Sequence, residues 1–177
     1  MRRSKQTTRK ERKSKQKSYK KDNINKTVHQ IFYNIGKGEL REIPAFYKCY
    51  KHNKAYCSKN NIKYKLWSEK DVVKLLNKPK NKKYKKLYYD FDQDIQRIDF
   101  ARLMILWNLG GIYIDLDICI KDKKSIKHLF DLPYFFVKWH TSRLPYNALL
   151  GTHKNTQLYE DILEHCKESY YEKRKQP

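Results

Sequence analysis

A helix that runs through two glycines directly into a strand is the feature that most constrains this chain. Residues 94–109 carry apolar side chains at helical spacing, so a broad apolar stripe covers one side of the expected helix. Gly110 and Gly111 follow, and glycine is the residue that best adopts the left-handed backbone at the end of a helix. Residues 112–118, IYIDLDI, then alternate as a strand does. The turn therefore brings the end of this helix close to the start of this strand.

The rest of the chain alternates strands with helices in the same way. We expect strands over residues 27–33, 62–67 and 134–139, with a further apolar run at 146–151. We expect helices over residues 44–60, 68–76, 125–130 and 155–171. Residues 78–86 hold six lysines among nine residues and are interpreted as a connection. This alternation predicts the α/β class, with a largely parallel sheet flanked by helices.

The charge of the chain is very uneven. The 177 residues include 41 Lys+Arg against 19 Asp+Glu, which gives a formal net charge of +22. Residues 1–21 hold eleven of the basic residues and only one acid, Glu11. We therefore predict a basic disordered tail over residues 1–24 and one domain over residues 25–177; a nuclear address or a phosphate-binding arm is the alternative for the tail. Charge of this sign favours phosphate-bearing partners: nucleic acid, an anionic membrane or a nucleotide-linked substrate.

Cysteine spacing and apolar runs give the expected compartment. The four cysteines show no C-x-x-C spacing, so neither a zinc site nor a disulfide framework is indicated, and we expect four reduced thiols. The longest unbroken apolar run, residues 103–107, is far shorter than a membrane span. The charged start of the chain has no apolar signal segment. These observations predict a soluble cytoplasmic protein, whose tail could associate peripherally with anionic surfaces.

Two acidic residues in the strand IYIDLDI are the first candidates for chemistry. Asp115 and Asp117 are two residues apart, so a strand would place both carboxylates on one face. Carboxylate oxygens suit a hard cation such as Mn²⁺ or Mg²⁺, which could bridge to a diphosphate. A solvated strand face gives the same pattern. Asp99 and Arg102 share one face of the preceding helix, and alone they could be an exposed ion pair worth about 0.3–0.5 kcal/mol.

Together these residues form a longer motif. Residues 99–117 read D-F-A-R-L-M-I-L-W-N-L-G-G-I-Y-I-D-L-D. This string resembles the DXD glycosyltransferase sugar-binding family, whose pattern is S-D-x-x-R-Y-x-x-L-y-x-x-G-G-x-Y-x-D-x-D. The positions that match in register are Asp99, Arg102, Gly110, Gly111, Tyr113, Asp115 and Asp117. The family includes capsular-polysaccharide and α-mannosyl transferases and shares its core with large glucosylating toxins. The resemblance covers roughly residues 27–165 and is most specific at residues 99–117.

The resemblance implies a fold, a reaction and a set of site residues. The implied fold is the GT-A type, a Rossmann-like, mostly parallel sheet flanked by helices. The implied reaction moves a hexose from a nucleotide-diphosphate sugar to a hydroxyl, with a divalent metal and with retention of configuration. The implied catalytic residues are Asp99, Arg102, Asp115 and Asp117, of which Asp115 and Asp117 would hold Mn²⁺ or Mg²⁺. The implied donor-binding residues are Phe32, Asp99, Arg102, Tyr113, Asp115 and Asn147.

Two of these donor residues come from outside the main motif. Phe32 ends the segment V-H-Q-I-F, which resembles the family's first strand, I-H-Q-I-W, whose final aromatic packs on the nucleobase. Asn147 belongs to Y-N-A-L-L, which resembles the N-x-h-h segment that lines the donor and acceptor pocket. His29, in the first strand, is interpreted as a core histidine and not a catalytic one.

The resemblance also implies a donor and an acceptor, and two other functions remain open. A UDP-sugar is the first choice of donor and GDP-mannose the second; the acceptor would be a glycan or protein hydroxyl. The sequence departs from the family at Ile98, where Ser is usual, and members generally carry further C-terminal sequence. One rival is therefore an inactive relative that binds sugar nucleotides. The other is a basic nucleic-acid-binding protein, although the chain contains no recognisable nucleic-acid-binding module.

Overall fold

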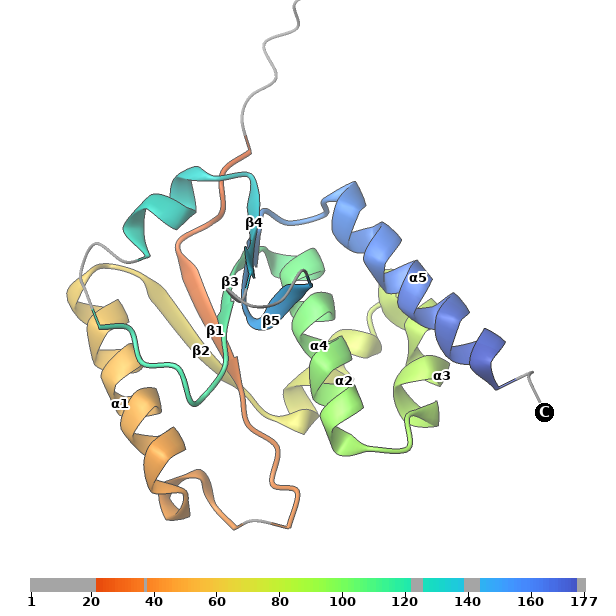
Figure 1. Ribbon diagram of the computed structural model, residues 1–177, viewed down its shortest axis with the longest axis horizontal. Helices are drawn as coiled ribbons and strands as arrows, with labels where there is room; N and C mark the ends of the chain where they lie inside the picture. Colours follow the sequence, from red (N-terminus) through yellow and green to blue (C-terminus); the bar gives the residue numbers. More distant parts are fainter. Residues whose placement is uncertain (1–21, 37, 122–125, 139–143, 175–177) are drawn as a thin grey trace, which may run out of the picture.

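The computed structural model describes residues 22–36, 38–121, 126–138 and 144–174, and its ten longer elements form one sheet with helices on both sides (Figure 1). The strands are β1 (Thr27–Ile31), β2 (Lys63–Trp67), β3 (Gly111–Ile114), β4 (Tyr134–Lys138) and β5 (Pro145–Thr152). The helices are α1 (Pro44–Lys59), α2 (Glu69–Leu76), α3 (Lys82–Asp90), α4 (Asp94–Leu109) and α5 (Gln157–Lys173). Three short 3-10 turns, η2 (Leu40–Glu42), η3 (Pro79–Asn81) and η4 (Lys127–Asp131), complete the described elements.

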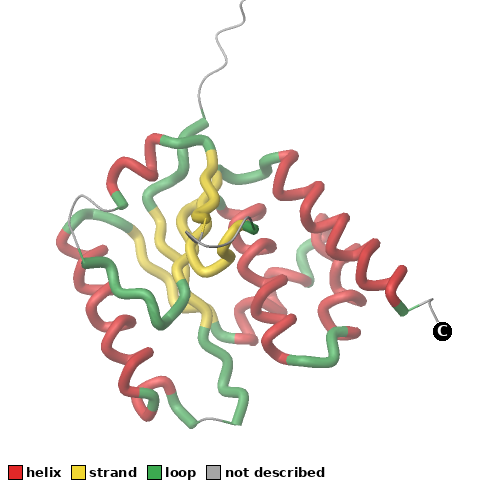
Figure 2. Tube along the Cα trace, viewed as in Figure 1, coloured by secondary structure: helices red, strands yellow, loops and turns green. Residues whose placement is uncertain are grey.

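The sheet confirms the predicted α/β class. Its strand order is β2-β1-β3-β5-β4, in which β1 pairs in parallel with both β2 and β3. β5 runs antiparallel to both β3 and β4, so four of the five strands point the same way. Figure 2 shows the strands between α1 on one side and the group α2 to α5 on the other. The architecture is a mixed, mostly parallel sheet flanked by helices, as predicted.

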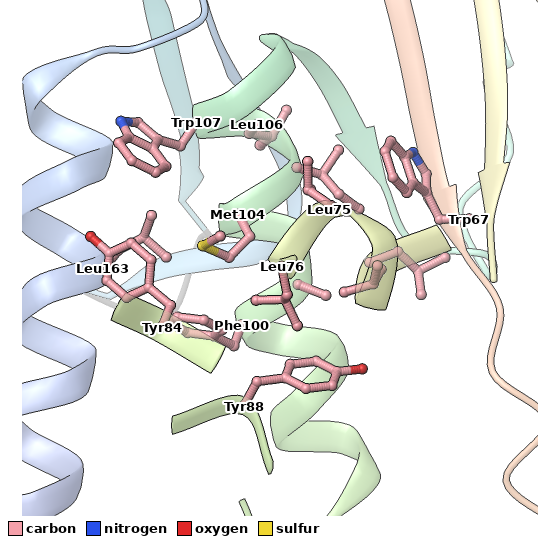
Figure 3. Packing of buried hydrophobic residues seen from close by; sticks show 14 of the residues in the cluster. Trp67, Leu75, Leu76, Tyr84, Tyr88, Phe100, Met104, Leu106, Trp107 and Leu163 are labelled. Atoms are coloured by element: carbon pink, nitrogen blue, oxygen red, sulfur yellow. The ribbon is translucent and has the colours of Figure 1, made fainter. Parts of the chain in front are cut away.

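Each face of the sheet has its own core. On one face, α1 and η4 pack on the strands through residues such as Cys57, Phe130 and Ile112. On the other face, α2, α3, α4 and α5 enclose a larger cluster that is rich in aromatic side chains (Figure 3). The members labelled there are Trp67, Leu75, Leu76, Tyr84, Tyr88, Phe100, Met104, Leu106, Trp107 and Leu163. Burial of these large side chains is the main favourable contribution to the fold.

The lysine-rich segment is a helix, so its interpretation as a connection was wrong. Residues 79–81 form η3, and α3 follows at once. Tyr84, Leu87 and Tyr88 lie three and four residues apart and are fully buried, while the lysines of α3 face solvent. The Tyr88 hydroxyl is 2.8 Å from that of Tyr33, which follows β1. The high lysine content concealed an amphipathic helix whose apolar face consists mainly of tyrosine.

The strand that was predicted to carry both aspartates ends earlier than expected. β3 stops at Ile114, and the N–H of Ile118 donates to the carbonyl of Asp115 over 3.1 Å, which closes a turn. Asp115 and Asp117 therefore lie in a turn and not on one face of a strand. The reason is tertiary: side chains from neighbouring elements bond the backbone here. One of them is Gln30, whose Nε2 donates to the Asp115 carbonyl over 3.0 Å.

The expectation of four reduced thiols was wrong for two of them. Cys49 on α1 and Cys119 form a disulfide with a Cα–Cα distance of 4.7 Å, while Cys57 and Cys166 are free. The two partners are 70 residues apart in the chain, and spacing rules detect only cysteines close in sequence. The loop after β3 brings Cys119 onto α1. The argument from reduced thiols to a compartment no longer holds.

Residues 1–21 of the predicted basic tail lie outside the described residues. Ile24, which the predicted boundary assigns to the tail, is buried, and its N–H donates to the carbonyl of Leu132 over 3.0 Å. In the described part of the chain, every helix is too short or too polar to span a bilayer.

The two glycines after α4 are required by space as well as by backbone conformation. Gly110 and Gly111 have φ values of 65° and 105°. A Cβ on Gly110 would lie 2.7 Å from the backbone nitrogen of Lys154, and one on Gly111 would lie 2.7 Å from the carbonyl oxygen of Thr27. Backbone atoms cannot yield as a flexible side chain can. The glycines thus let α4 pass into β3 at the centre of the sheet.

His29 on β1 supports the same turn and is a buried core residue, as predicted. Its Nδ1 accepts a hydrogen bond from the indole N–H of Trp67 over 3.1 Å, because an indole nitrogen can only donate. The proton therefore resides on Nε2, which donates to the Gly110 carbonyl over 2.9 Å. Burial lowers the pKa of His29 from 6.5 to about 4.

This histidine should make the stability depend on pH. Below about pH 6.5 the unfolded chain protonates His29 while the folded chain does not, so the free energy of unfolding should fall as the pH drops towards about 4. The loss should reach roughly 3 kcal/mol. His29→Gln removes it, so the stability difference between wild type and variant should shrink between pH 7 and pH 4 in urea unfolding. Parallel stability curves would contradict this assignment.

Candidate functional site

A buried arginine on α4 is the centre of the candidate site. The side chain of Arg102 is only 4% exposed and forms an ion pair with Asp99, one turn earlier on the helix. Its Nη1 lies 3.2 Å from Oδ1 of Asp115 and donates to the carbonyl of Asn147 over 2.9 Å. The guanidinium also lies over the ring of Tyr113, 4.9 Å from its centre. Arg102 therefore joins α4, the end of β3 and β5 in one polar cluster.

Asp115 is held by several elements at once. The Tyr113 hydroxyl donates to its Oδ1 over 2.6 Å. Burial raises the pKa of Tyr113 well above its ordinary value, so this hydroxyl keeps its proton and remains a donor. The backbone N–H of Asp115 donates to the carbonyl of Ala148 on β5 over 2.8 Å. The Asp115 carboxylate is thus oriented by Tyr113 and Arg102 before any ligand binds.

Gln30 is a supporting residue that the sequence analysis missed. It is fully buried on β1, where its amide donates to the Asp115 carbonyl. The Tyr64 hydroxyl donates to its Oε1 over 2.7 Å, so both ends of the amide are bonded. A glutamine in a short strand between Val28 and Ile31 was the available signal, because such a polar group is buried only when it has partners.

Asp99 and Asn147 form the other side of the cluster. Asn147 donates from Nδ2 to Oδ1 of Asp99 over 3.3 Å, while its carbonyl accepts from Arg102. Burial raises the pKa of Asp99, and the charge of Asp115 acts in the same direction, whereas the Arg102 charge opposes it. The Asp99 side chain remains 44% exposed and can therefore accept a hydrogen bond from a ligand.

Two hollows meet at this cluster. The first has a volume of about 270 Å³ and is lined by Phe32, Arg102, Tyr113, Asp115 and Asp117, together with apolar side chains from β1, α1 and α4. It lies beyond the carboxyl ends of the parallel strands β1 and β3, which is where open α/β sheets bind ligands. We call it the first pocket.

The second pocket lies on the other side of Arg102. It has a volume of about 380 Å³ between α4 and α5, and Asp99, Arg102 and Asn147 form its wall. Its remaining lining residues are Phe91, Gln96, Phe100, Leu103, Cys166, Ser169, Tyr170 and Lys173. The structure thus brings all the sequence-predicted site residues to one region, but divides them between two pockets. Arg102 lines both.

The two aspartates have the donor chemistry of a site for a hard cation. Asp117 is exposed, and Asp115 is partly exposed with its carboxylate directed by Tyr113 and Arg102. The described residues contain no cluster of three His, Cys, Asp or Glu side chains that could hold a metal without other ligands. Mg²⁺ binds through one or two carboxylates together with water and substrate phosphates. These residues therefore fit a cation that is shared with a phosphate ligand.

The family and the relatives that this chain resembles are glycosyltransferases. A sequence model of the family described as glycosyltransferase sugar-binding region containing DXD motif matches residues 39–133. An uncharacterised glycosyltransferase of Acanthamoeba polyphaga mimivirus is 26% identical over 142 residues, which cover 77% of this chain and 53% of that protein. Inositol phosphoceramide mannosyltransferase 1 of Schizosaccharomyces pombe is 31% identical over 77 residues, which cover 42% of this chain and 24% of that protein.

A solved structure supports the fold. The PaToxG glycosyltransferase superposes with a TM-score of 0.59 at 16% sequence identity, over 85% of this chain and 62% of that one. The chain spans about half the length of the first curated relative and a quarter of the second. The family match extends over more than half of the chain and includes α1, α4 and the turn with the two aspartates, so the chain belongs to the DXD-containing glycosyltransferase sugar-binding family.

Proposed function

We propose that this chain transfers a hexose from a nucleotide-diphosphate sugar to a hydroxyl of a glycan or protein. The observation that carries the proposal is the position of Arg102, which lines both pockets and bonds carboxylates on either side. A donor lying across this residue would have its nucleotide in the first pocket and its sugar beside Asp99. A UDP-sugar is the first donor to test. GDP-mannose is the second, because the yeast relative is named a mannosyltransferase.

The first pocket suits a nucleoside diphosphate. Phe32 lines it together with the apolar side chains of Ile35, Ile43 and Phe46, and an aromatic ring offers a face on which a flat base can stack. Asp115 and Asp117 line the same pocket. The family generally uses a divalent metal. Here Asp115 and Asp117 would hold Mn²⁺ or Mg²⁺, which would offset the negative charge of the departing diphosphate.

Arg102 supplies a permanent positive charge next to that diphosphate. Its Nε is buried without a hydrogen-bond partner among the described residues, and a buried donor left unpaired costs about 1–3 kcal/mol. A ligand oxygen that reached this N–H would remove the cost. Such a preorganised donor stabilises charge as it develops on the leaving group.

The second pocket suits the transferred sugar and the acceptor. Asp99 and Asn147 present a carboxylate and an amide on its wall, and sugar hydroxyls can bond to both. The acceptor hydroxyl would approach from the side of α5, where Ser169 and Lys173 line the pocket. Retention of configuration, as the family resemblance implies, would require attack on the same face from which the diphosphate leaves.

Hydrolysis of sugar nucleotides tests the proposal against an inactive relative. With Mn²⁺ present, wild-type protein should hydrolyse one member of a panel of UDP-sugars and GDP-mannose. Asp117→Asn should lower this rate on the order of 100-fold, because a metal contributes several kcal/mol to charge stabilisation. Asp161→Asn, at an exposed carboxylate on α5, is the control and should retain the rate. Equal background rates in wild type and Asp117→Asn would sink the enzyme hypothesis.

Helix α4 offers a matched test of the arginine. It carries two Asp–Arg pairs three residues apart, Asp94–Arg97 and Asp99–Arg102, and each arginine also donates to one backbone carbonyl. Arg102→Lys should lower kcat/KM roughly 10- to 100-fold because lysine cannot reproduce the planar set of donors. Arg97→Lys should change it less than about twofold. Similar losses in both variants would mean that Arg102 has only a structural role.

Phe32 can be tested through donor affinity. Phe32→Ala should weaken UDP binding roughly tenfold, since stacking of a base on an aromatic ring is worth about 1–3 kcal/mol. Phe32→Trp keeps a stacking face and should bind UDP at least as well as wild type. Competition of UDP with the donor gives both affinities. Unchanged affinity in Phe32→Ala would place the base elsewhere.

The rival function, nucleic-acid binding, predicts a different outcome. Removal of residues 1–21 deletes eleven basic residues and one acid. If polynucleotide binding is lost while metal-dependent donor hydrolysis persists, then the tail is an accessory to the enzyme.

A further inference from the structure

One face of α1 contacts the loop that follows Asp115 and Asp117. Cys49, His52 and Asn53 lie three and four residues apart, so they share one side of the helix. All three contact the backbone or the cysteine of residues 117–120. We call these three residues the α1 clamp. The clamp lies on the opposite side of the sheet from α4 and Arg102 (Figure 1).

Asn53 makes the most complete contact in the clamp. It is fully buried, and its Nδ2 donates to the carbonyl of Ile118 over 2.8 Å. Its Oδ1 accepts from the N–H of Ile120, also over 2.8 Å. One side-chain amide therefore bonds the backbone on both sides of Cys119. Since this segment belongs to no strand, Asn53 supplies partners that a sheet would otherwise provide.

The other two clamp residues reinforce this contact. Cys49 is joined covalently to Cys119, and its Sγ lies 3.6 Å from the carbonyl oxygen of Asp117. The His52 ring bonds the carbonyl of Ile120 through Nε2. Residues 118, 119 and 120 are thus each bonded to a side chain of α1.

We propose that Asn53 is a positioning residue that places the Asp117 carboxylate on the wall of the first pocket. Asp117 is exposed, so packing does not hold its side chain, and its location follows from the backbone of the turn. The N–H of Ile118 closes the turn by donating to the Asp115 carbonyl, and the carbonyl of Ile118 accepts a hydrogen bond from Asn53. Asn53 acts through Ile118 and not by touching the ligand. The inference rests on the proposed function.

A second buried asparagine provides the matched control. Asn81 is also fully buried, and its Nδ2 donates to the Leu75 carbonyl over 2.7 Å and to Oδ1 of Asn108 over 3.0 Å. It lines neither of the two pockets. Asn53→Ala and Asn81→Ala should therefore lower the melting temperature by comparable amounts, whereas only the first should affect the site.

The test is calorimetric binding of UDP, and of GDP, to the full chain with and without Mn²⁺. Asn53→Ala should weaken the Mn²⁺-dependent binding roughly tenfold or more, as losses of residues that orient metal ligands typically do. Asn53→Asp keeps the acceptor for Ile120 but loses the donor to Ile118, the bond through which Asn53 acts, so its loss should be of the same order. It serves as the second measurement if Asn53→Ala is too unstable. Binding without metal should be unchanged in both variants, and Asn81→Ala should bind as wild type.

The outcomes separate the inference from the proposed function. In an Asp117→Asn background, Asn53→Ala should cause no further loss, because the carboxylate that it positions is absent. Wild-type affinity in Asn53→Ala, or an equal loss in Asn81→Ala, overturns the positioning role. A wild-type chain that binds neither nucleotide in a Mn²⁺-dependent way overturns the proposed metal-assisted function, and the inference with it.

Discussion

The site depends on the burial of one guanidinium, that of Arg102. Removing a cation from water is costly, and the cost is offset here by the carboxylates of Asp99 and Asp115 and by the Asn147 carbonyl. These partners come from α4, the end of β3 and β5, so the interaction fixes how three elements meet. The same burial creates a wall shared by two pockets. The partners that bond the Arg102 guanidinium leave the residue lining both pockets, so a single ligand could contact it from both pockets.

The turn of residues 115–118 is held from both faces of the sheet. From the face covered by α4, Arg102 and Tyr113 orient the Asp115 carboxylate. From the face covered by α1, Asn53 and the disulfide at Cys119 hold the backbone just beyond Asp117. Gln30 in the central strand bonds the Asp115 carbonyl between them. The acidic pair therefore has a well-supported backbone although it lies outside any strand.

Much of this arrangement could be predicted from sequence because its signals are local. The helical stripe of residues 94–109, the two glycines and the spacing of Asp99, Arg102 and Asp115 are all contained in one short segment. Two of the errors arose where residues distant in the sequence decide the structure. The backbone after β3 bonds side chains of Gln30 and Asn53, and Cys119 pairs with a partner 70 residues away. α3 was missed because its many lysines outweighed the spacing of Tyr84 and Tyr88.

The most direct test of the central claim is the position of a cation and a diphosphate in crystals grown with Mn²⁺ and UDP. The account predicts an anomalous scattering peak bonded to carboxylate oxygens of Asp115 and Asp117 and to the diphosphate, with the uracil beside Phe32. A well-occupied Mn²⁺ and UDP bound elsewhere on the chain, with the acidic pair free of both, would contradict it.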